Sequence, residues 1–70
     1  MNLAEMTQRE LLCVEELLAA EALAIRKCQM FAEQCKDSEL KRLFEHYTQQ
    51  HQNHYNTILT HLNAGSAITH

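Results

Sequence analysis

The spacing of apolar residues in the first half of the chain is the feature that most limits how it can fold. Positions at alternating intervals of three and four residues form one line: Leu11, Val14, Leu18, Glu21, Ile25, Cys28, Ala32 and Cys35. Residues with this spacing share one face of an α-helix, whereas the faces of a strand alternate at every residue. The chain contains no proline and only one glycine, so little interrupts a long helix. We therefore predict an all-α protein.

The start of the first helix has a recognisable signal. Thr7 is followed three residues later by Glu10, as in a capping box, in which the hydroxyl and the carboxylate each accept a backbone N–H. The apolar line begins directly afterwards and ends near Lys36. We expect one helix over about residues 8–35, which would be about 40 Å long.

A second helix is predicted to begin after a short break. Asp37 is a suitable N-cap, and Glu39 places a negative charge in the first turn. We expect this helix over about residues 38–63, ended by Gly65 in a left-handed conformation and followed by a short tail, residues 64–70. Since the break is short, the two helices should form an antiparallel hairpin, a single domain over residues 1–70.

A lone hairpin would leave apolar residues in water. The expected inner face of the second helix consists of Leu40, Leu43, Phe44, Tyr47, His51, His54, Ile58 and either His61 or Leu62. The first helix carries a further apolar line away from that contact: Leu12, Ala19, Ala20, Leu23 and Met30. Burying both lines requires another partner, and the simplest partner is a second copy. We therefore expect a homodimer that forms a ferritin-like four-helix bundle.

Histidines are concentrated in the second helix and suggest a metal site. All 5 histidines lie within residues 46–70, a stretch without Asp, Glu, Lys or Arg. Counting outward from the turn places Glu21, His51 and His54 at one level of the hairpin. Two imidazoles and one carboxylate suit a single Zn²⁺, or Fe²⁺ with open positions, and also tolerate Cu²⁺ and Ni²⁺. The alternative is a metal-free cluster in which Glu21 hydrogen-bonds a histidine and fixes the helix register.

The remaining histidines and the cysteines have simpler interpretations. His46, His61 and His70 are expected at the surface or in assembly contacts, and protonation of the histidine-rich half between about pH 5 and 7 predicts pH-sensitive association. Tyr47 and Tyr55 are expected near the cluster, chiefly as packing residues. Two of the three cysteines are expected to be buried thiols, because seven residues on one helix separate them too widely for a disulfide: Cys28 and Cys35. Cys13 is the candidate for an intermolecular disulfide.

Charge and hydropathy exclude some partners. The formal charge of −3 lies in the first 45 residues, and no basic stripe indicates nucleic-acid binding. No apolar run has the length of a membrane span, and the N-terminal residues do not read as a secretory signal. We expect a chain synthesised in the cytoplasm that binds neither nucleic acid nor membrane.

Three segments carry a resemblance to a known family. They are residues 15–21 in the first helix, residues 36–44 across the turn, and residues 49–58 in the second helix, and the likeness covers about residues 7–62. Here the chain resembles the small ferritin-like spore coat proteins of endospore-forming bacteria, the coat-F-like group. The resemblance implies a hairpin that dimerises and packs into the spore's protein shell. It also implies ligand roles for Glu21 and His54, while the family usually has Glu where this chain has His51.

Three functions follow from these patterns. The first is a structural, self-assembling subunit located in the spore coat. The second is a ferritin-like metal-binding protein or oxidoreductase that uses Glu21, His51 and His54. The third is an adaptor hairpin whose second apolar line binds a different protein. We favour the structural role over an enzyme, because the second helix has an uncharged Asn-, Gln- and Thr-rich face that repels neighbouring copies less than a charged face would.

Overall fold

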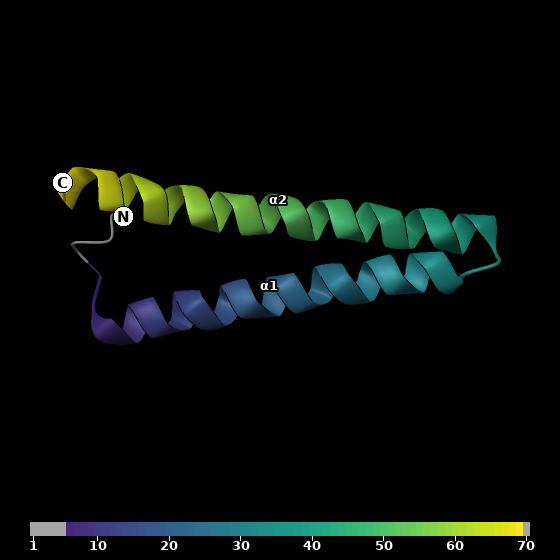
Figure 1. Cartoon of the computed structure of the whole chain (residues 1–70), viewed down its shortest axis with the longest axis horizontal. Helices are drawn as coiled ribbons and strands as arrows, with labels where there is room; N and C mark the ends of the chain where they lie inside the picture. Colours follow the sequence, from purple (N-terminus) through teal and green to yellow (C-terminus); the bar gives the residue numbers. More distant parts are fainter. Residues whose placement is uncertain (1–5, 70) are drawn as a thin grey trace.

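The protein is a hairpin of two long antiparallel helices. In this computed structural model the backbone is described for residues 6–69 and the side chains for residues 6–62. Helix α1 spans Gln8–Gln34, helix α2 spans Ser38–Thr69, and a short turn joins them (Figure 1). The predicted all-α hairpin is confirmed. Within the described residues, neither helix combines the length and the apolar character that crossing a bilayer requires.

Helix α1 begins with the predicted capping box. The Glu10 N–H donates to the Thr7 hydroxyl at 3.1 Å, and the Thr7 N–H donates to the Glu10 carboxylate at 3.1 Å. These contacts favour the ionised carboxylate, so the Thr7 backbone N–H, followed by the Thr7 side chain, lowers the pKa of Glu10. Two of the backbone N–H groups at the start of the helix are satisfied in this way.

The turn is also built as the sequence predicts. Helix α1 ends at Gln34, and the N–H of its C-cap residue, Cys35, donates to the Phe31 carbonyl at 2.9 Å. Asp37 caps α2: its carboxylate accepts the Leu40 N–H at 2.8 Å, and its carbonyl accepts the Lys41 N–H at 3.0 Å. Because only residues 35–37 separate the helices, α2 must fold back along α1.

The end of α2 differs from the prediction. The helix continues to Thr69, so residues 64–69 are helical backbone instead of the expected tail, and Gly65 lies inside the helix and not at a left-handed cap. No residue of the described backbone has a positive φ. A single glycine costs a helix only about 1 kcal/mol relative to alanine, and no proline follows to stop it. His70, expected at the surface or in an assembly contact, lies outside the described residues.

The contact between the helices, called the seam here, matches the prediction on α1. Every predicted α1 position is half-buried or buried: Leu11, Val14, Leu18, Glu21, Ile25, Cys28, Ala32 and Cys35. On α2 the prediction is confirmed in part: the expected Phe44, His51, Ile58 and Leu62 lie in the seam, together with Thr48, Gln52 and Tyr55, which were not expected there. Leu40, Leu43, Tyr47 and His54 were predicted in the seam, but they are exposed beside it. From Phe44 onward the α2 seam follows intervals of three and four residues, with Gln52 beside this line. The seam therefore includes two polar residues, Thr48 and Gln52, in addition to the apolar residues that we expected.

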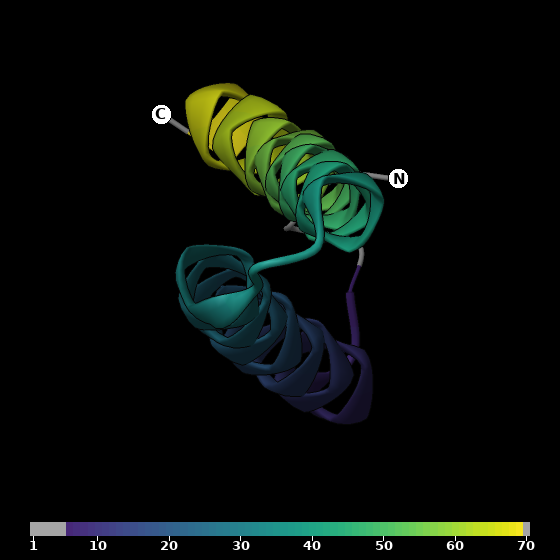
Figure 2. The same cartoon turned by 90° about the vertical axis from the view of Figure 1, so that its right-hand side faces the viewer.

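The hairpin is too thin to have a core of its own. Its extents are 48 × 19 × 14 Å, so the short dimension is little more than the width of one helix. Viewed from the turn, it is a single layer of two helices (Figure 2). Among the described residues only Ala32 is buried, and the ring contact between Phe31 and Phe44, with centroids 5.3 Å apart, leaves Phe31 40% exposed. Two-layer packing is what normally buries the apolar face of a helix.

The exposed apolar residues fall on two separate surfaces. We call the first the open face; it flanks the seam and carries Leu17, Phe31, Leu40, Leu43 and Tyr47, each 40–47% exposed. Both helices contribute to the open face, because Leu17 of α1 and His61 of α2 line one shallow pocket. His61 lies seven residues beyond His54, so His54 is on the same face of α2. The opposite flank is polar and carries Gln29, Glu33, Lys41, Glu45 and Thr48.

The second surface, called the back line here, belongs to α1 alone. It includes Leu12, Leu23 and Met30, which are 59%, 52% and 47% exposed, together with the exposed Ala19. These positions share a helix face that points away from α2. The predicted second apolar line is therefore exposed in the hairpin. Leu59, 37% exposed on α2, belongs to neither surface.

Candidate metal site

A carboxylate and an imidazole meet across the seam at mid-length. Glu21 lies thirteen residues before the end of α1 at Gln34, and His51 lies thirteen residues after the start of α2 at Ser38, so the hairpin brings them to one level. The His51 Nδ1 and a Glu21 carboxylate oxygen are 2.7 Å apart. The Glu21 side chain is 14% exposed and that of His51 is 32% exposed. The expected convergence of these residues is confirmed.

His54 completes the cluster one turn further along α2. Its Nδ1 lies 3.8 Å from the other Glu21 oxygen, and its ring meets the His51 ring edge-on with centroids 6.0 Å apart. Its side chain is 63% exposed, so it lies at the rim of the seam on the open face. We expected the hairpin to enclose the cluster within its seam. Instead, the cluster opens towards the open face, where His54 lies.

The cluster has the geometry of a three-ligand metal site. One ligand atom from each of Glu21, His51 and His54 lies within 4.8 Å of the other two. A tetrahedral ion bound at the usual Zn–N and Zn–O distances holds its ligands about 3.3 Å apart, so small side-chain rotations would bring the three onto one ion. With neutral imidazoles the set carries one negative charge. Three protein ligands leave a fourth position open, as in catalytic zinc sites.

Without a metal, the same residues form a hydrogen-bonded pair. The 2.7 Å contact between His51 and Glu21 is the only described side-chain hydrogen bond that joins the two helices. A metal at Nδ1 would replace this bond, because the nitrogen must give up its proton to bind the ion. The two states therefore compete, and each satisfies the half-buried carboxylate.

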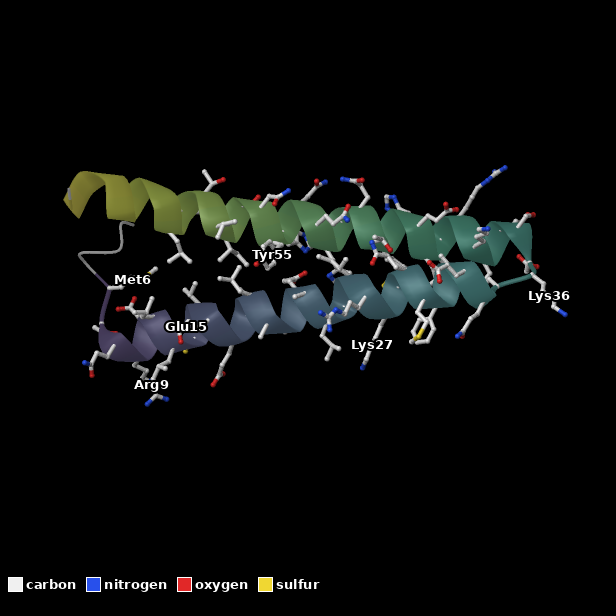
Figure 3. The ribbon with its side chains drawn as sticks, viewed as in Figure 1. Met6, Arg9, Glu15, Lys27, Lys36 and Tyr55 are labelled. Atoms are coloured by element: carbon white, nitrogen blue, oxygen red, sulfur yellow. The ribbon has the colours of Figure 1, made fainter. Side chains whose placement is uncertain are left out.

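The other candidate residues lie near the cluster or apart from it. Tyr55 projects from α2 into the space between the helices (Figure 3), one turn after His51 and half-buried, while Tyr47 is 40% exposed on the open face. Among the described hydrogen bonds none joins a tyrosine hydroxyl to the cluster, which leaves packing as the role that the structure supports. His46 and His61 are exposed, as expected.

The three cysteines are free thiols. Cys13 is exposed, in agreement with the prediction, while Cys28 and Cys35 are half-buried and not fully buried as expected. They remain half-buried because a single layer of helices shields them on one side only. An intermolecular disulfide through Cys13 stays a prediction.

Sequence reasoning missed Thr48, Gln52 and Tyr55 as seam residues around the cluster. For Thr48 and Tyr55 the signal was present, because with His51 they continue the alternating intervals that begin at Phe44. The competing line through Leu40, Leu43 and Tyr47 is more apolar and was therefore preferred.

The chain is 35% identical over 54 residues to the uncharacterized protein YuzM of Bacillus subtilis (strain 168), and the match covers 77% of this chain and 67% of YuzM. The chain belongs to the YuzM family. No family model and no solved structure matches the chain.

Proposed function

We propose that the protein is a structural subunit that works as an assembly of copies. Two hairpins associate through their open faces into a ferritin-like four-helix bundle, and the bundles join into a larger protein layer. The observation that carries this proposal is the open face itself: five large apolar side chains, each 40–47% exposed, lie on one side of a hairpin that is 14 Å thick. Several exposed apolar side chains on one side of a thin hairpin indicate an interaction site.

The exposed side chains of the open face retain apolar energy that association could use. Burying a whole leucine contributes about 1.5–3 kcal/mol, so a leucine that is 43% exposed retains about 1 kcal/mol for association. Five such residues, each present twice in a two-fold interface, give about 10 kcal/mol before the entropic cost of association. The polar opposite flank offers no comparable surface.

The cellular setting of this proposal is a spore coat. The support is the resemblance of the two helices and the turn to the coat-F-like proteins, and the occurrence of the relative YuzM in a Bacillus agrees with it. A coat subunit needs a self-associating surface, which the open face provides. Fluorescent tagging of the protein in its own sporulating host tests the setting: a ring around the spore supports it, and a uniform cytoplasmic signal contradicts it.

The assembly itself is tested by mass and metal content together. Protein purified without a histidine tag would be analysed by native mass spectrometry and elemental analysis at pH 7. Dimers and multiples of dimers support the structural proposal. A monomer at every concentration would contradict it and would leave the open face to a different protein, the adaptor role.

The second candidate function is metal binding by Glu21, His51 and His54, with Zn²⁺ or Fe²⁺ as the expected ion. The geometry of the three ligand atoms favours it. Pairing of the open faces would cover the exposed His54 and bring two clusters to the same level of one bundle. Such a site would have an open position for a further ligand, which is the feature that an oxidoreductase activity would need.

Metal binding is tested by zinc titration of the apoprotein. About one ion per chain is expected, with a rise in thermal stability that a chelator removes. Glu21→Gln and His54→Ala should each abolish the tight binding. His46→Ala is the matched control, because this histidine is exposed and lies outside the cluster. Equal affinity in all four proteins would refute the site.

A further inference from the structure

The back line of α1 has charges placed between its apolar residues in a regular order. Along this face the sequence reads Arg9, Leu12, Glu16, Ala19, Leu23, Arg26, Met30 and Glu33. The intervals alternate between three and four, so the eight residues form one continuous helix face. All eight are exposed, and the last of them, Glu33, lies at the edge of this face, where it also borders the polar flank. Arg9 lies on the side of α1 that faces away from α2 (Figure 3).

We propose that this face binds the same face of a second copy in an antiparallel pair, with Leu12 of one chain opposite Met30 of the other. The inference deepens the proposed structural function, because it supplies a second interface in addition to the open face. The pair has two-fold symmetry, so every contact occurs twice.

In this register, each residue of the back line lies opposite a residue of compatible chemistry in the second copy; each such pair of opposed positions is called a layer here. It places Leu12 opposite Met30 and Ala19 opposite Leu23, so apolar residues meet apolar residues. The charged layers are then fixed by the sequence: Glu16 lies opposite Arg26, and Arg9 lies opposite Glu33. Each charged layer therefore joins an acidic and a basic residue, the pattern that sets partner and orientation in helix pairs.

Neighbouring registers lose this match. A shift of one heptad in one direction places Arg9 opposite Arg26, and a shift in the other direction places Glu16 opposite Glu33. A parallel pair in register places Glu16 opposite Glu16. Like charges in direct opposition disfavour all three arrangements. The charge pattern thus selects one antiparallel register and identifies a second copy as the partner.

Two further observations support the pairing. Ala20 and Ala22 flank the face at its midpoint and would lie next to their own copies across the two-fold axis, so the helices can approach closely there. Within the hairpin, Glu16 and Arg26 have no residue of opposite charge three or four positions away on their helix. The described salt bridges all join Glu21 to histidines, so these two charges remain available to a partner.

The consequence is an assembly that can grow. A dimer formed through the open faces still carries two back lines, one from each chain. Each dimer can therefore bind two further dimers, and the result is a chain of bundles instead of a closed dimer. The hairpin alone provides both contacts, so no other protein is required.

Charge reversal tests the register. Glu16→Arg places arginine opposite Arg26 at two symmetric points, and Arg26→Glu places glutamate opposite Glu16 at two points. Each single variant should weaken the back-line contact at least about tenfold, because like charges then oppose each other. The chain with both substitutions restores opposite charges and should regain the wild-type assembly. Native mass spectrometry and sedimentation velocity give the readout, and circular dichroism verifies that the helices remain.

Mixing the two single variants provides a second measurement that does not depend on the double variant. Neither variant should pair with itself through the back line, but the two together should pair with each other, because arginine then meets glutamate in both layers. The proposal is overturned if the single variants assemble like wild type, or if neither the mixture nor the double variant recovers the wild-type mass.

The outcomes separate this contact from the open-face dimer. If both interfaces exist, the single variants stop at dimers. If only the back line exists, wild type is a dimer, the single variants are monomers, and the double variant is again a dimer. If only the open face exists, all the proteins are dimers, which refutes the back-line pair and leaves the proposed bundle intact.

Discussion

Leu43→Ala is the substitution that examines the open face most closely. Leu43 is 43% exposed, so the fold of the hairpin already buries more than half of its surface. If dimerisation buries the remainder, truncation costs about 1 kcal/mol per chain. A two-fold interface contains the residue twice, so the dimer loses about 2 kcal/mol, which corresponds to an increase of about thirtyfold in the dissociation constant.

The assay is sedimentation equilibrium across a concentration series. All chains would carry Glu16→Arg, so that the back line makes no contribution. Leu59→Ala is the matched control, because Leu59 is 37% exposed but lies away from the open face. We expect the control to dimerise like its parent. An unchanged dissociation constant for Leu43→Ala, or an equal shift in both variants, would refute the assignment of the open face as the dimer contact.

Three further substitutions test separate parts of the account. Thr7→Ala removes the helix cap and should lower the free energy of unfolding by about 1 kcal/mol, measured by urea denaturation. The Thr7 backbone N–H, followed by the Thr7 side chain, lowers the folded-state pKa of Glu10, so the stability that the ionised Glu10 contributes is present at neutral pH and is lost as the pH falls through that lowered pKa. Thr7→Ala keeps this backbone N–H, so most of the stability difference between the two proteins should persist in acid; equal stability of the two proteins at neutral pH would contradict the cap. Glu21→Ala should leave the metal-free protein as stable as wild type or more so, because a half-buried charge is removed, and a large loss in a denaturation curve would refute this. Phe44→Ala should cost about 2 kcal/mol through loss of the half-buried seam contact with Phe31, and an unchanged denaturation midpoint would show that this contact does not stabilise the hairpin.

The sequence predicted the parts of this structure that depend on local chemistry. Thr7 and Asp37 are caps whose side chains bond to backbone groups three residues away, so no distant contact is needed to recognise them. The α1 seam was also predictable, because a single apolar line with regular intervals is unambiguous. The level of Glu21 and His51 then followed from counting residues away from the turn.

The prediction failed where two patterns competed. On α2 the line through Leu40, Leu43 and Tyr47 is more apolar than the true seam, which contains Thr48 and Gln52. Hydrophobicity alone cannot distinguish a face that packs within the hairpin from a face that packs on another copy. For the same reason His54 was expected in the seam, whereas it lies at its rim.

The helix end was the other failure. Gly65 is a common helix terminator, but its preference is worth only about 1 kcal/mol, and no proline in the sequence reinforces it. The helix therefore continues through this position to Thr69.

The mass of the wild-type protein in solution shows whether the hairpin is half of a bundle. Native mass spectrometry of chelator-treated protein at pH 7, supported by sedimentation velocity, would give this mass. The account predicts even multiples of the 8.1 kDa chain, with the dimer as the smallest species. A fully helical 8.1 kDa monomer at every concentration would show that the hairpin is stable with its apolar open face in water, and would contradict the account.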